Sequence, residues 1–476
     1  MTRRHHSLVL GCLGAGAVLM TSTGALASGF ATARFGGEHG HPTTDNPTAI
    51  YYNPAGIAED TPGFEKKFWR VKIFADANLA LRWASWSHQT SQFDVPEPEG
   101  AQGANSGTGE LFNAVTAPMA GATFQVENFA FGAAFFVPFG GQSVYDKNEQ
   151  FTDNPNFAGP VDGVQRWHSI EGIIRSMYIS VAAAYDILDR VSIGASLNIV
   201  KSDVDTIRAR TANGTNSIDL PAEGRSWIDV GGWHASFGVG VIGEVAPEKV
   251  WIGASYQARP GLGQMELSGT LNNNFPDPAV ADTKTVQNVK LIQELPDVFR
   301  MGVRARPVEK VELRVFGDVT TWGVFDSQCV IPESAEECLV DDNYAALPDA
   351  GANAPLLNIV RNWGTAFGVR AGGSYWVIPE VELFLGAGYD SNAIPDETLE
   401  VALTDFHDVS VAGGLRLAFG EIFAAALSYT HLFYVPRDTT GQSELPTYEP
   451  PSRTPDSGGE YTQTIGVINA NVQVSF

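Results

Sequence analysis

The sequence predicts an all-β protein: a 14-stranded antiparallel transmembrane β-barrel whose lumen is plugged by an N-terminal hatch. Three observations predict this fold class. Stretches of about 10 residues alternate apolar and polar side chains, the connections between them alternate between short and long, and a Gly- and Pro-rich segment precedes the first stretch. Short turns at one rim and long loops at the other are typical of an outer-membrane barrel, whereas a soluble sandwich has no reason to sort its loops by end.

The last stretch, 465–476, shows the alternation most clearly. Ile468, Val472 and Phe476 share one face, while Asn469 and Asn471 share the other. Side chains alternate at period two along a strand, so this stretch has one apolar and one polar face. The same pattern predicts strands at 68–83, 118–126, 129–137, 175–185, 191–201, 233–245, 250–257, 298–306, 311–325, 363–376, 381–390, 406–419, 422–434 and 465–476.

The connections between these strands fall into two alternating classes. One class is two to five residues long. The other comprises residues 88–117, 138–174, 202–232, 258–297, 326–362, 391–405 and 435–464. An even number of strands places both termini at the short-turn rim, which we expect to be periplasmic, and the long loops are then extracellular.

Charges on the alternate face predict a polar lumen. In the stretch 311–322, Glu312 and Arg314 alternate with apolar residues, and such charges must face water or each other. Aromatic residues near the strand ends, such as Trp83 and Trp251, are expected at the lipid interface.

The first 27 residues read as a signal peptide. Arg3 and Arg4 lie in a polar n-region, an apolar run covers 8–20, and Ala25-Leu26-Ala27 is an A-x-A cleavage site. We therefore divide the chain into a signal peptide (1–27), a hatch (28–65) and a barrel (66–476).

Composition and charge exclude other classes of protein. The net charge of −24 argues against nucleic acid as a partner, because phosphates need a basic surface. Beyond the signal peptide no run of 18 apolar residues occurs, so we predict no membrane-spanning helix. The 50 glycines suit a strand-rich chain with tight turns.

Two cysteines remain after the signal peptide, Cys329 and Cys338, in a polar stretch. In an oxidising, exported setting we expect a disulfide that closes one small loop. A metal pair would need further His or Cys residues nearby, and His39 with His41 lacks a third ligand, so no metal or cofactor is predicted.

We predict that the protein is not an enzyme, and an outer-membrane lipase or protease is the alternative. Residues 238–243 match G-x-G-x-x-G, but Pro247 follows where a nucleotide-binding fold would open a helix. The sequence contains no G-x-S-x-G nucleophile motif.

The segment 28–65 is rich in Gly and Pro, which break any regular ladder. A disordered tail is one interpretation. The apolar residues of 49–58, however, need burial, and the barrel lumen is the natural place for them.

At this point the chain resembles the FadL-type transporters of long-chain fatty acids and hydrocarbons (the OmpP1/FadL/TodX family). The resemblance rests on Ser28-Gly29-Phe30, Asn53-Pro54-Ala55, Phe136-Val137-Pro138-Phe139-Gly140, Leu295-Pro296-Asp297, Thr321-Trp322, the block 370–416 and the closing aromatic residue. It covers essentially the whole mature chain.

The resemblance implies passive uptake of hydrophobic molecules across a bacterial outer membrane. Phe30, Asn53, Pro54 and Ala55 would belong to the hatch. The implied partners are a hydrophobic ligand, most readily a long-chain fatty acid, and outer-membrane lipid, and the protein would be a monomer. Uptake of hydrocarbons or aromatic compounds, or a general porin or adhesin, are the alternatives.

Lumen aromatics distinguish these alternatives, because a general pore prefers a clear polar lumen. Phe74, Phe136, Phe316, Trp322 and Phe384 fall on the inward-facing set and are the candidate ligand route. They would alternatively only pack the hatch.

Pro138 ends the apolar run 129–137 and is followed by Gly140 and Gly141. Proline cannot donate a ladder hydrogen bond, so the strand should kink or lose pairing here. The resemblance implies a lateral opening from the lumen to the membrane at Pro138, Gly140 and Gly141. The alternative is that Pro138 merely ends the strand at the outer rim.

Overall fold

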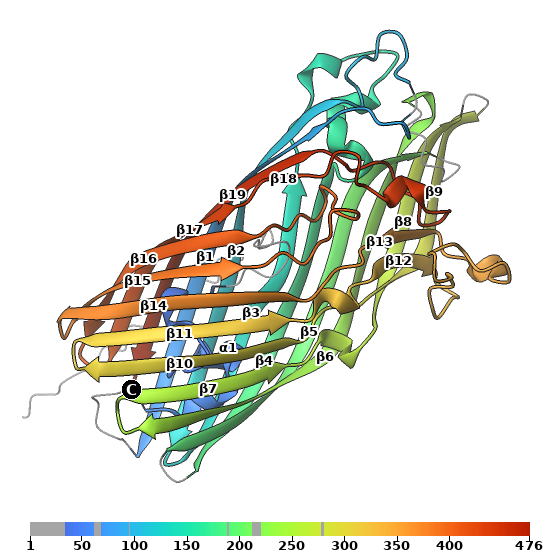
Figure 1. Cartoon of the computed structure of the whole chain (residues 1–476). Helices are drawn as coiled ribbons and strands as arrows, with labels where there is room; N and C mark the ends of the chain where they lie inside the picture. The colour runs from blue at the N-terminus through green and yellow to red at the C-terminus, as the bar shows by residue number, and fades with distance from the viewer. Residues whose placement is uncertain (1–33, 61–67, 95, 188–189, 212–219, 278–279) are drawn as a thin grey trace, which may run out of the picture.

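The computed structural model of the chain describes residues 34–60, 68–94, 96–187, 190–211, 220–277 and 280–476. Within this part, 14 antiparallel strands form a closed barrel (Figure 1). Their order is β1, β2, β3, β4, β5, β6, β7, β10, β11, β14, β15, β16, β17 and β19, and pairing of β19 with β1 closes the wall. The predicted fold class is confirmed.

The strands are β1 (Trp69–His88), β2 (Gly107–Val126), β3 (Phe129–Val144), β4 (Glu171–Ile187), β5 (Val191–Thr211), β6 (Glu223–Ala246), β7 (Val250–Gln257), β8 (Met265–Asp277), β9 (Val280–Gln293), β10 (Val298–Val308), β11 (Val311–Thr320), β12 (Ser327–Pro332), β13 (Leu357–Val360), β14 (Ala366–Ile378), β15 (Val381–Asp390), β16 (Asp408–Phe419), β17 (Phe423–Tyr434), β18 (Arg437–Asp438) and β19 (Glu460–Ser475).

The helical elements in the described residues are short. The α-helix is α1 (Ala49–Tyr52), and the 3₁₀ helices are η1 (Gly37–His39), η2 (Pro54–Ala58), η3 (Glu149–Phe151), η4 (Gly159–Asp162), η5 (Val164–Trp167), η6 (Leu220–Ala222), η7 (Pro260–Leu262), η8 (Trp322–Val324), η9 (Gly351–Asn353) and η10 (Leu445–Thr447). None of these described helices is long and apolar enough to cross a membrane.

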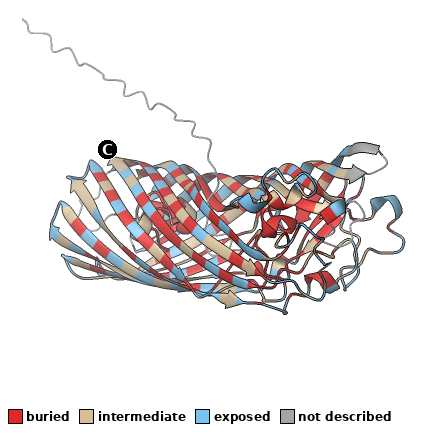
Figure 2. Ribbon diagram, turned by 90° about the horizontal axis from the view of Figure 1, so that it is seen from above, coloured by how far each residue is buried: buried red, intermediate tan, exposed pale blue. Residues whose placement is uncertain are grey.

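Buried and exposed residues alternate along the wall strands (Figure 2). In β11, Glu312 and Arg314 are buried in the lumen, while Leu313 and Val315 are 51% and 55% exposed on the outside. Apolar side chains therefore face the lipid and charged side chains face the interior, as the period-two pattern predicts.

The two rims differ as predicted. At one rim, short turns join β2 to β3, β6 to β7, β10 to β11, β14 to β15 and β16 to β17. The turn after β16 places Gly420 at φ 58°, a conformation that glycine adopts without steric cost. At the other rim lie the long loops. The loop 391–405 is packed into the interior, where Leu399, Val401 and Leu403 are at most 5% exposed.

Several wall strands are longer than predicted at the long-loop rim. β2 begins at Gly107 rather than residue 118, β5 runs on to Thr211, and β6 begins at Glu223. Beyond the lipid zone the outer face becomes polar, so the hydrophobic pattern fades although the hydrogen-bonded ladder continues. The prediction of plain loops at 258–297 and 326–362 was wrong for the same reason: β8 and β9 extend the sheet from β6, and β12 and β13 pair beyond them.

The hatch, of which the structure describes residues 34–60, lies inside the barrel (Figure 1). Phe35, Ile50 and Ala55 are at most 1% exposed. The apolar residues of this segment are therefore buried against the wall rather than in a tail. Phe30 lies outside the described residues.

Trp251 does not lie at the lipid interface as expected. It is buried, packs with Ala55 and Ile242, and has the guanidinium of Arg304 4.3 Å from its ring. In β7 its position falls on the lumen-facing parity, so strand phase overrides nearness to the strand end.

Candidate functional site

The ladder between β2 and β3 breaks at Pro138. The two strands pair from Val126 and Phe129 up to Met119 and Phe136, where their register ends. On the other side of β3, the register with β4 shifts between Phe136 and Phe139. Proline has no N–H to donate, so the break falls where the ladder lacks a donor.

β3 does not end at this break. It continues to Val144, and all residues from Phe136 to Gly141 are buried, so both faces of the strand are covered there. The alternative that Pro138 ends the strand at the outer rim is therefore wrong. Pro138, Gly140 and Gly141 lie within the strand, at a bend that interrupts its alternation.

The two strands meet again nearer the loop rim. Asn113 Nδ2 donates to the carbonyl oxygen of Val144 at 3.2 Å, and the Val144 amide donates to Asn113 Oδ1 at 3.2 Å. The stretch between this contact and the Met119–Phe136 pair is hereafter the gap. A broken ladder at membrane depth is costly unless other protein covers it or it lines a cavity.

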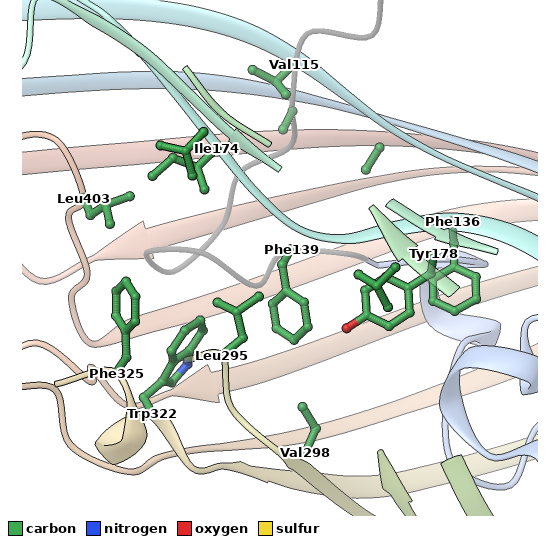
Figure 3. Packing of buried hydrophobic residues seen from close by; sticks show 14 of the residues in the cluster. Val115, Phe136, Phe139, Ile174, Tyr178, Leu295, Val298, Trp322, Phe325 and Leu403 are labelled. Atoms are coloured by element: carbon green, nitrogen blue, oxygen red, sulfur yellow. The ribbon is translucent and has the colours of Figure 1, made fainter. Parts of the chain in front are cut away.

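Aromatic side chains gather behind the gap (Figure 3). Phe136 stacks on Tyr178 with ring centroids 5.3 Å apart, and Phe139 lies 6.3 Å from Tyr178 and 6.1 Å from Trp322. Trp322 continues the contacts to Phe325 and Trp363. These six residues, the aromatic cluster, form a continuous apolar surface that reaches the gap. The cluster residues are Phe136, Phe139, Tyr178, Trp322, Phe325 and Trp363.

A central cavity of about 100 Å³ lies between the aromatic cluster and the hatch. Tyr51, Phe139, Phe316 and Trp322 are among its lining residues. On its charged side Arg370 donates to Asp318 at 2.8 Å and to Asp390 at 2.7 Å. Because these charges are paired with each other, the cavity can offer its aromatic side to an apolar ligand.

Asn53 anchors the hatch to the wall. Its Nδ2 donates to the carbonyls of Pro42 at 2.8 Å and Val241 at 3.1 Å, and its Oδ1 accepts from the Ala55 amide at 3.1 Å. A side chain at Gly240 would place a Cβ 2.0 Å from Asn53 Oδ1. The small residues of the 238–243 stretch therefore leave space for Asn53 of the hatch and do not form a nucleotide-binding loop.

Pro54 and Ala55 pack directly on another wall glycine. A Cβ at Gly194 would lie 2.4 Å from the backbone of both residues. The Asn53-Pro54-Ala55 motif thus packs on the inner face of β5 and β6, over the cross-strand pair Gly194 and Gly240, where the glycines let the hatch backbone approach the wall closely.

A larger cavity of about 1230 Å³ opens beneath the hatch at the short-turn rim. Phe74 is part of its wall, with charged residues such as Arg304 and Arg314. Phe384 packs edge-on against the hatch residue His39, with ring centroids 4.8 Å apart. The hatch thus stands between this cavity and the central cavity.

The candidate route residues accordingly divide into two groups. The structure brings Phe136, Phe316 and Trp322 to the central cavity or the aromatic cluster, whereas Phe74 and Phe384 lie at or below the hatch. Sequence reasoning missed Phe139, Tyr178, Phe325 and Trp363. Phe139 follows Pro138, and an aromatic residue at a predicted break was the available signal.

Buried charges tie the inward-folded loops together. Glu400, in the loop between β15 and β16, accepts from Arg361 through Oε1 and lies 3.3 Å from His168 Nδ1 through Oε2. Burial alone would raise the pKa of the Glu400 carboxyl, but the charge of Arg361 and the hydrogen bond of His168 lower it to about 2. The ion pair of Glu400 with Arg361 and its contact with His168 therefore hold these loops together.

Cys329 of β12 and Cys338 are joined through their sulfurs in the long loop between β11 and β14, with Cα atoms 6.1 Å apart. In the described residues, no three His, Cys, Asp or Glu side chains are grouped so as to hold a metal ion.

This architecture is similar to that of known outer-membrane proteins. A family model described as outer membrane protein transport protein (OMPP1/FadL/TodX) matches residues 14–431. The structure is similar to a Pseudomonas aeruginosa FadL homologue, with a TM-score of 0.69 at 14% identity over 94% of this chain and 99% of that one. It is also similar to the Ralstonia pickettii toluene transporter TbuX, with a TM-score of 0.60 at 16% identity over 94% of this chain and 99% of that one. The P. putida toluene transporter TodX matches with a TM-score of 0.58 at 14% identity over 90% of this chain and 94% of that one. No curated protein matches the sequence.

Proposed function

Because this chain belongs to the OMPP1/FadL/TodX family, whose members transport hydrophobic compounds across the outer membrane, we propose that it takes up long-chain fatty acids passively and releases them sideways through the gap. At the identities found, the solved structures support the fold, so the proposal for the cargo rests on the lumen of this chain.

The continuous aromatic cluster carries the proposal. It leads from beneath the loops, along Trp322 and Phe139, to the bend of β3. An apolar molecule that follows this surface stays out of water and reaches the gap at membrane depth. The lateral opening then lies at Pro138, Gly140 and Gly141.

The proposed arrangement in the membrane follows from the rims. The short-turn rim and both termini face the periplasm, and the long loops face outward. Residues 1–27 are removed as a signal peptide, 28–65 act as the hatch, 66–476 form the barrel, and the protein works as a monomer without a cofactor.

A monoaromatic hydrocarbon is the second candidate cargo. The edge-on rings of the cluster, such as Trp322 with Trp363 at 5.0 Å, suit a planar ligand as well as an alkyl chain. A general porin is less well supported, because the hatch fills the lumen that a porin would leave open.

Uptake of a labelled long-chain fatty acid and of labelled toluene by cells that carry the protein tests the proposal. We expect Trp322→Ala to weaken ligand binding roughly tenfold or more, since burying an aromatic side chain is worth about 1.5–3 kcal/mol. Trp83→Ala, which removes a lipid-facing ring that is 46% exposed, is the matched control. Equal uptake in cells with and without the protein would reject the function. Mass spectrometry of apolar molecules that co-purify with the protein would identify the cargo.

A further inference from the structure

The cavity of about 1230 Å³ beneath the hatch, hereafter the vestibule, is more basic than the chain that encloses it. Residues of the short turns, such as Lys249 and Glu421, line its mouth. The lining as a whole includes eight Lys and Arg side chains and six Asp and Glu side chains, whereas the whole chain has 30 basic and 54 acidic residues. A concave surface with an excess of positive charge attracts anions. The vestibule therefore differs in charge from the rest of this acidic molecule.

Two of these basic residues lie directly opposite each other in the wall. Arg304 of β10 and Arg314 of β11 are register partners, and a short turn joins their two strands (Figure 1). Both line the vestibule, and their side chains are 3% and 1% exposed. Like charges directly opposite on neighbouring strands destabilise a sheet, and burial strengthens their repulsion. An anion bound between the two guanidiniums would offset this repulsion.

The carboxylates of the protein satisfy this pair only in part. Arg304 Nη1 lies 3.5 Å from Asp45 Oδ1 of the hatch, and Arg314 Nη1 lies 3.7 Å from Glu312 Oε1. Within the described part of the chain, Nε and Nη2 of Arg304 and Nε and Nη1 of Arg314 have no hydrogen-bond partner. A buried donor without an acceptor costs free energy, and an arginine cannot relieve this cost by losing its proton. The pair thus has four N–H groups that a bound anion could accept from.

Other contacts hold each guanidinium in place. The guanidinium of Arg304 lies 4.3 Å from the ring of Trp251, and Arg314 Nη2 donates to Ser374 Oγ at 2.6 Å. Both side chains are therefore ordered before a ligand binds, which lowers the entropic cost of binding. In Arg304 the unpaired Nε and Nη2 form one edge of the guanidinium, the fork with which arginine binds two oxygens of one anion.

We infer that the vestibule binds a phosphate group between Arg304 and Arg314. A phosphate offers at least three acceptor oxygens and close to two negative charges, so it can accept from both guanidiniums at once and offset both of their charges. A carboxylate has only two oxygens and one charge. The phosphate is either free phosphate or the head group of a lipid at the short-turn rim. The hatch stands between this site and the aromatic cluster, so the inference goes beyond the proposed function and does not depend on the cargo.

Equilibrium dialysis of labelled inorganic phosphate against the full mature chain in a non-ionic detergent tests the site. We expect saturable binding, and Arg304→Gln and Arg314→Gln should each weaken it roughly tenfold or more, because each removes charge-assisted hydrogen bonds. Arg306→Gln is the matched control. It removes the same charge from the same vestibule, but Arg306 Nη2 donates to the Glu309 carbonyl at 2.9 Å and the residue lies outside the opposed pair. Its affinity for phosphate should stay within about twofold of wild type.

Thermal unfolding gives a second measurement, because a ligand that binds only the folded state stabilises it. Phosphate should raise the temperature at which wild type loses its compact, heat-modifiable form on electrophoresis. It should not shift this temperature in Arg304→Gln or Arg314→Gln. The presence of the compact form at low temperature verifies that each variant folds.

Three results would overturn the inference: no saturable binding of millimolar phosphate to wild type, unchanged binding in both Arg304→Gln and Arg314→Gln, or an equal loss in Arg306→Gln. The last would show that the vestibule attracts anions only through its diffuse charge. Displacement of phosphate by acetate at equal concentration would overturn the assignment to phosphate.

Dihexanoyl phosphatidic acid, used below its critical micelle concentration, distinguishes the two sources of the phosphate group. If it displaces the label at concentrations at least about tenfold lower than unlabelled phosphate does, the site holds a lipid head group. If it displaces the label less well than phosphate, the site holds free phosphate. Either result supports the phosphate site, and neither bears on the uptake experiment that tests the proposed function.

Discussion

Asn53 of the hatch donates from Nδ2 to the carbonyl oxygen of Val241 in β6, at 3.1 Å. This bond joins the plug to a wall whose glycines leave room for it. We predict that Asn53→Ala loosens the hatch without unfolding the barrel, because each lost hydrogen bond costs about 0.5–1.5 kcal/mol and the Ala55 amide loses its acceptor. Hydrogen exchange of residues 34–60 should accelerate.

Asn156→Ala, in an exposed loop position, is the control and should leave exchange in the hatch unchanged. Equal protection of the hatch in the Asn53 variant and the wild type would show that this motif does not anchor it.

Deletion of residues 28–56 should open a conductive pore in planar bilayers. The hatch separates the central cavity from the cavity of about 1230 Å³ at the short-turn rim, so its removal connects the two. The full-length chain in the same bilayers is the reference. A deletion variant that folds and remains closed would contradict the role of this segment as a plug.

The Glu400 carboxyl predicts a dependence of stability on pH. Its pKa is lowered from 4.5 to about 2, so the carboxylate stabilises the folded state above pH 4.5 and this contribution is lost as the pH falls from 4.5 toward 2. Glu400→Gln should therefore reduce the free energy of unfolding by up to about 3 kcal/mol at pH 7, and the difference from wild type should shrink below pH 4.

The exposed neighbour Glu397, in the same loop, is the matched site. Urea unfolding of Glu397→Gln should follow the wild type at every pH. A difference between Glu400→Gln and wild type that is constant with pH would contradict the ion-pair explanation.

Cys329 and Cys338 should resist labelling in the unreduced protein. The two sulfurs are joined in a long loop that we place outside the cell, where the environment is oxidising. Treatment with a maleimide before and after reduction, followed by mass spectrometry, should show two new labels only after reduction. Labelling of both thiols without reductant would disprove the pairing in the mature protein.

The sequence pattern predicted strand bounds accurately where the outer face of the strand is apolar and faces lipid. The predicted bounds 250–257 and 381–390 coincide with β7 and β15, because outward-facing apolar residues mark the whole of each strand. The pattern failed above the lipid, where β5 and β6 continue on polar residues and where β8, β9, β12 and β13 extend the sheet. There the ladder is held by backbone hydrogen bonds, which leave little trace in composition.

The site was predictable in part for a similar reason. Pro138 alone predicted the break in the hydrogen-bonded ladder, because proline lacks an N–H whatever its surroundings. Tyr178, in contrast, gains its role from Phe136 and Phe139 on the neighbouring strand, and no local pattern identifies it. The central cavity likewise arises from segments far apart in the chain, such as Tyr51, Phe139 and Trp322.

The lateral exit leads to the last prediction. Gly140 and Gly141 lie at the bend of β3, where both faces of the strand are buried and the register with β2 has ended. Replacing both glycines with leucine should fill the gap with side chains and reduce uptake of a hydrophobic substrate severalfold, while the amount of protein at the cell surface stays the same. Gly243→Leu is the control, since a Cβ at that wall position meets no atom within 4 Å, and its uptake should match the wild type. If the double variant is present at the surface in normal amount and its uptake is unaltered, the ligand does not leave through the gap. The path would then have to lead past the hatch to the cavity at the short-turn rim, and the hatch deletion would raise uptake in the double variant.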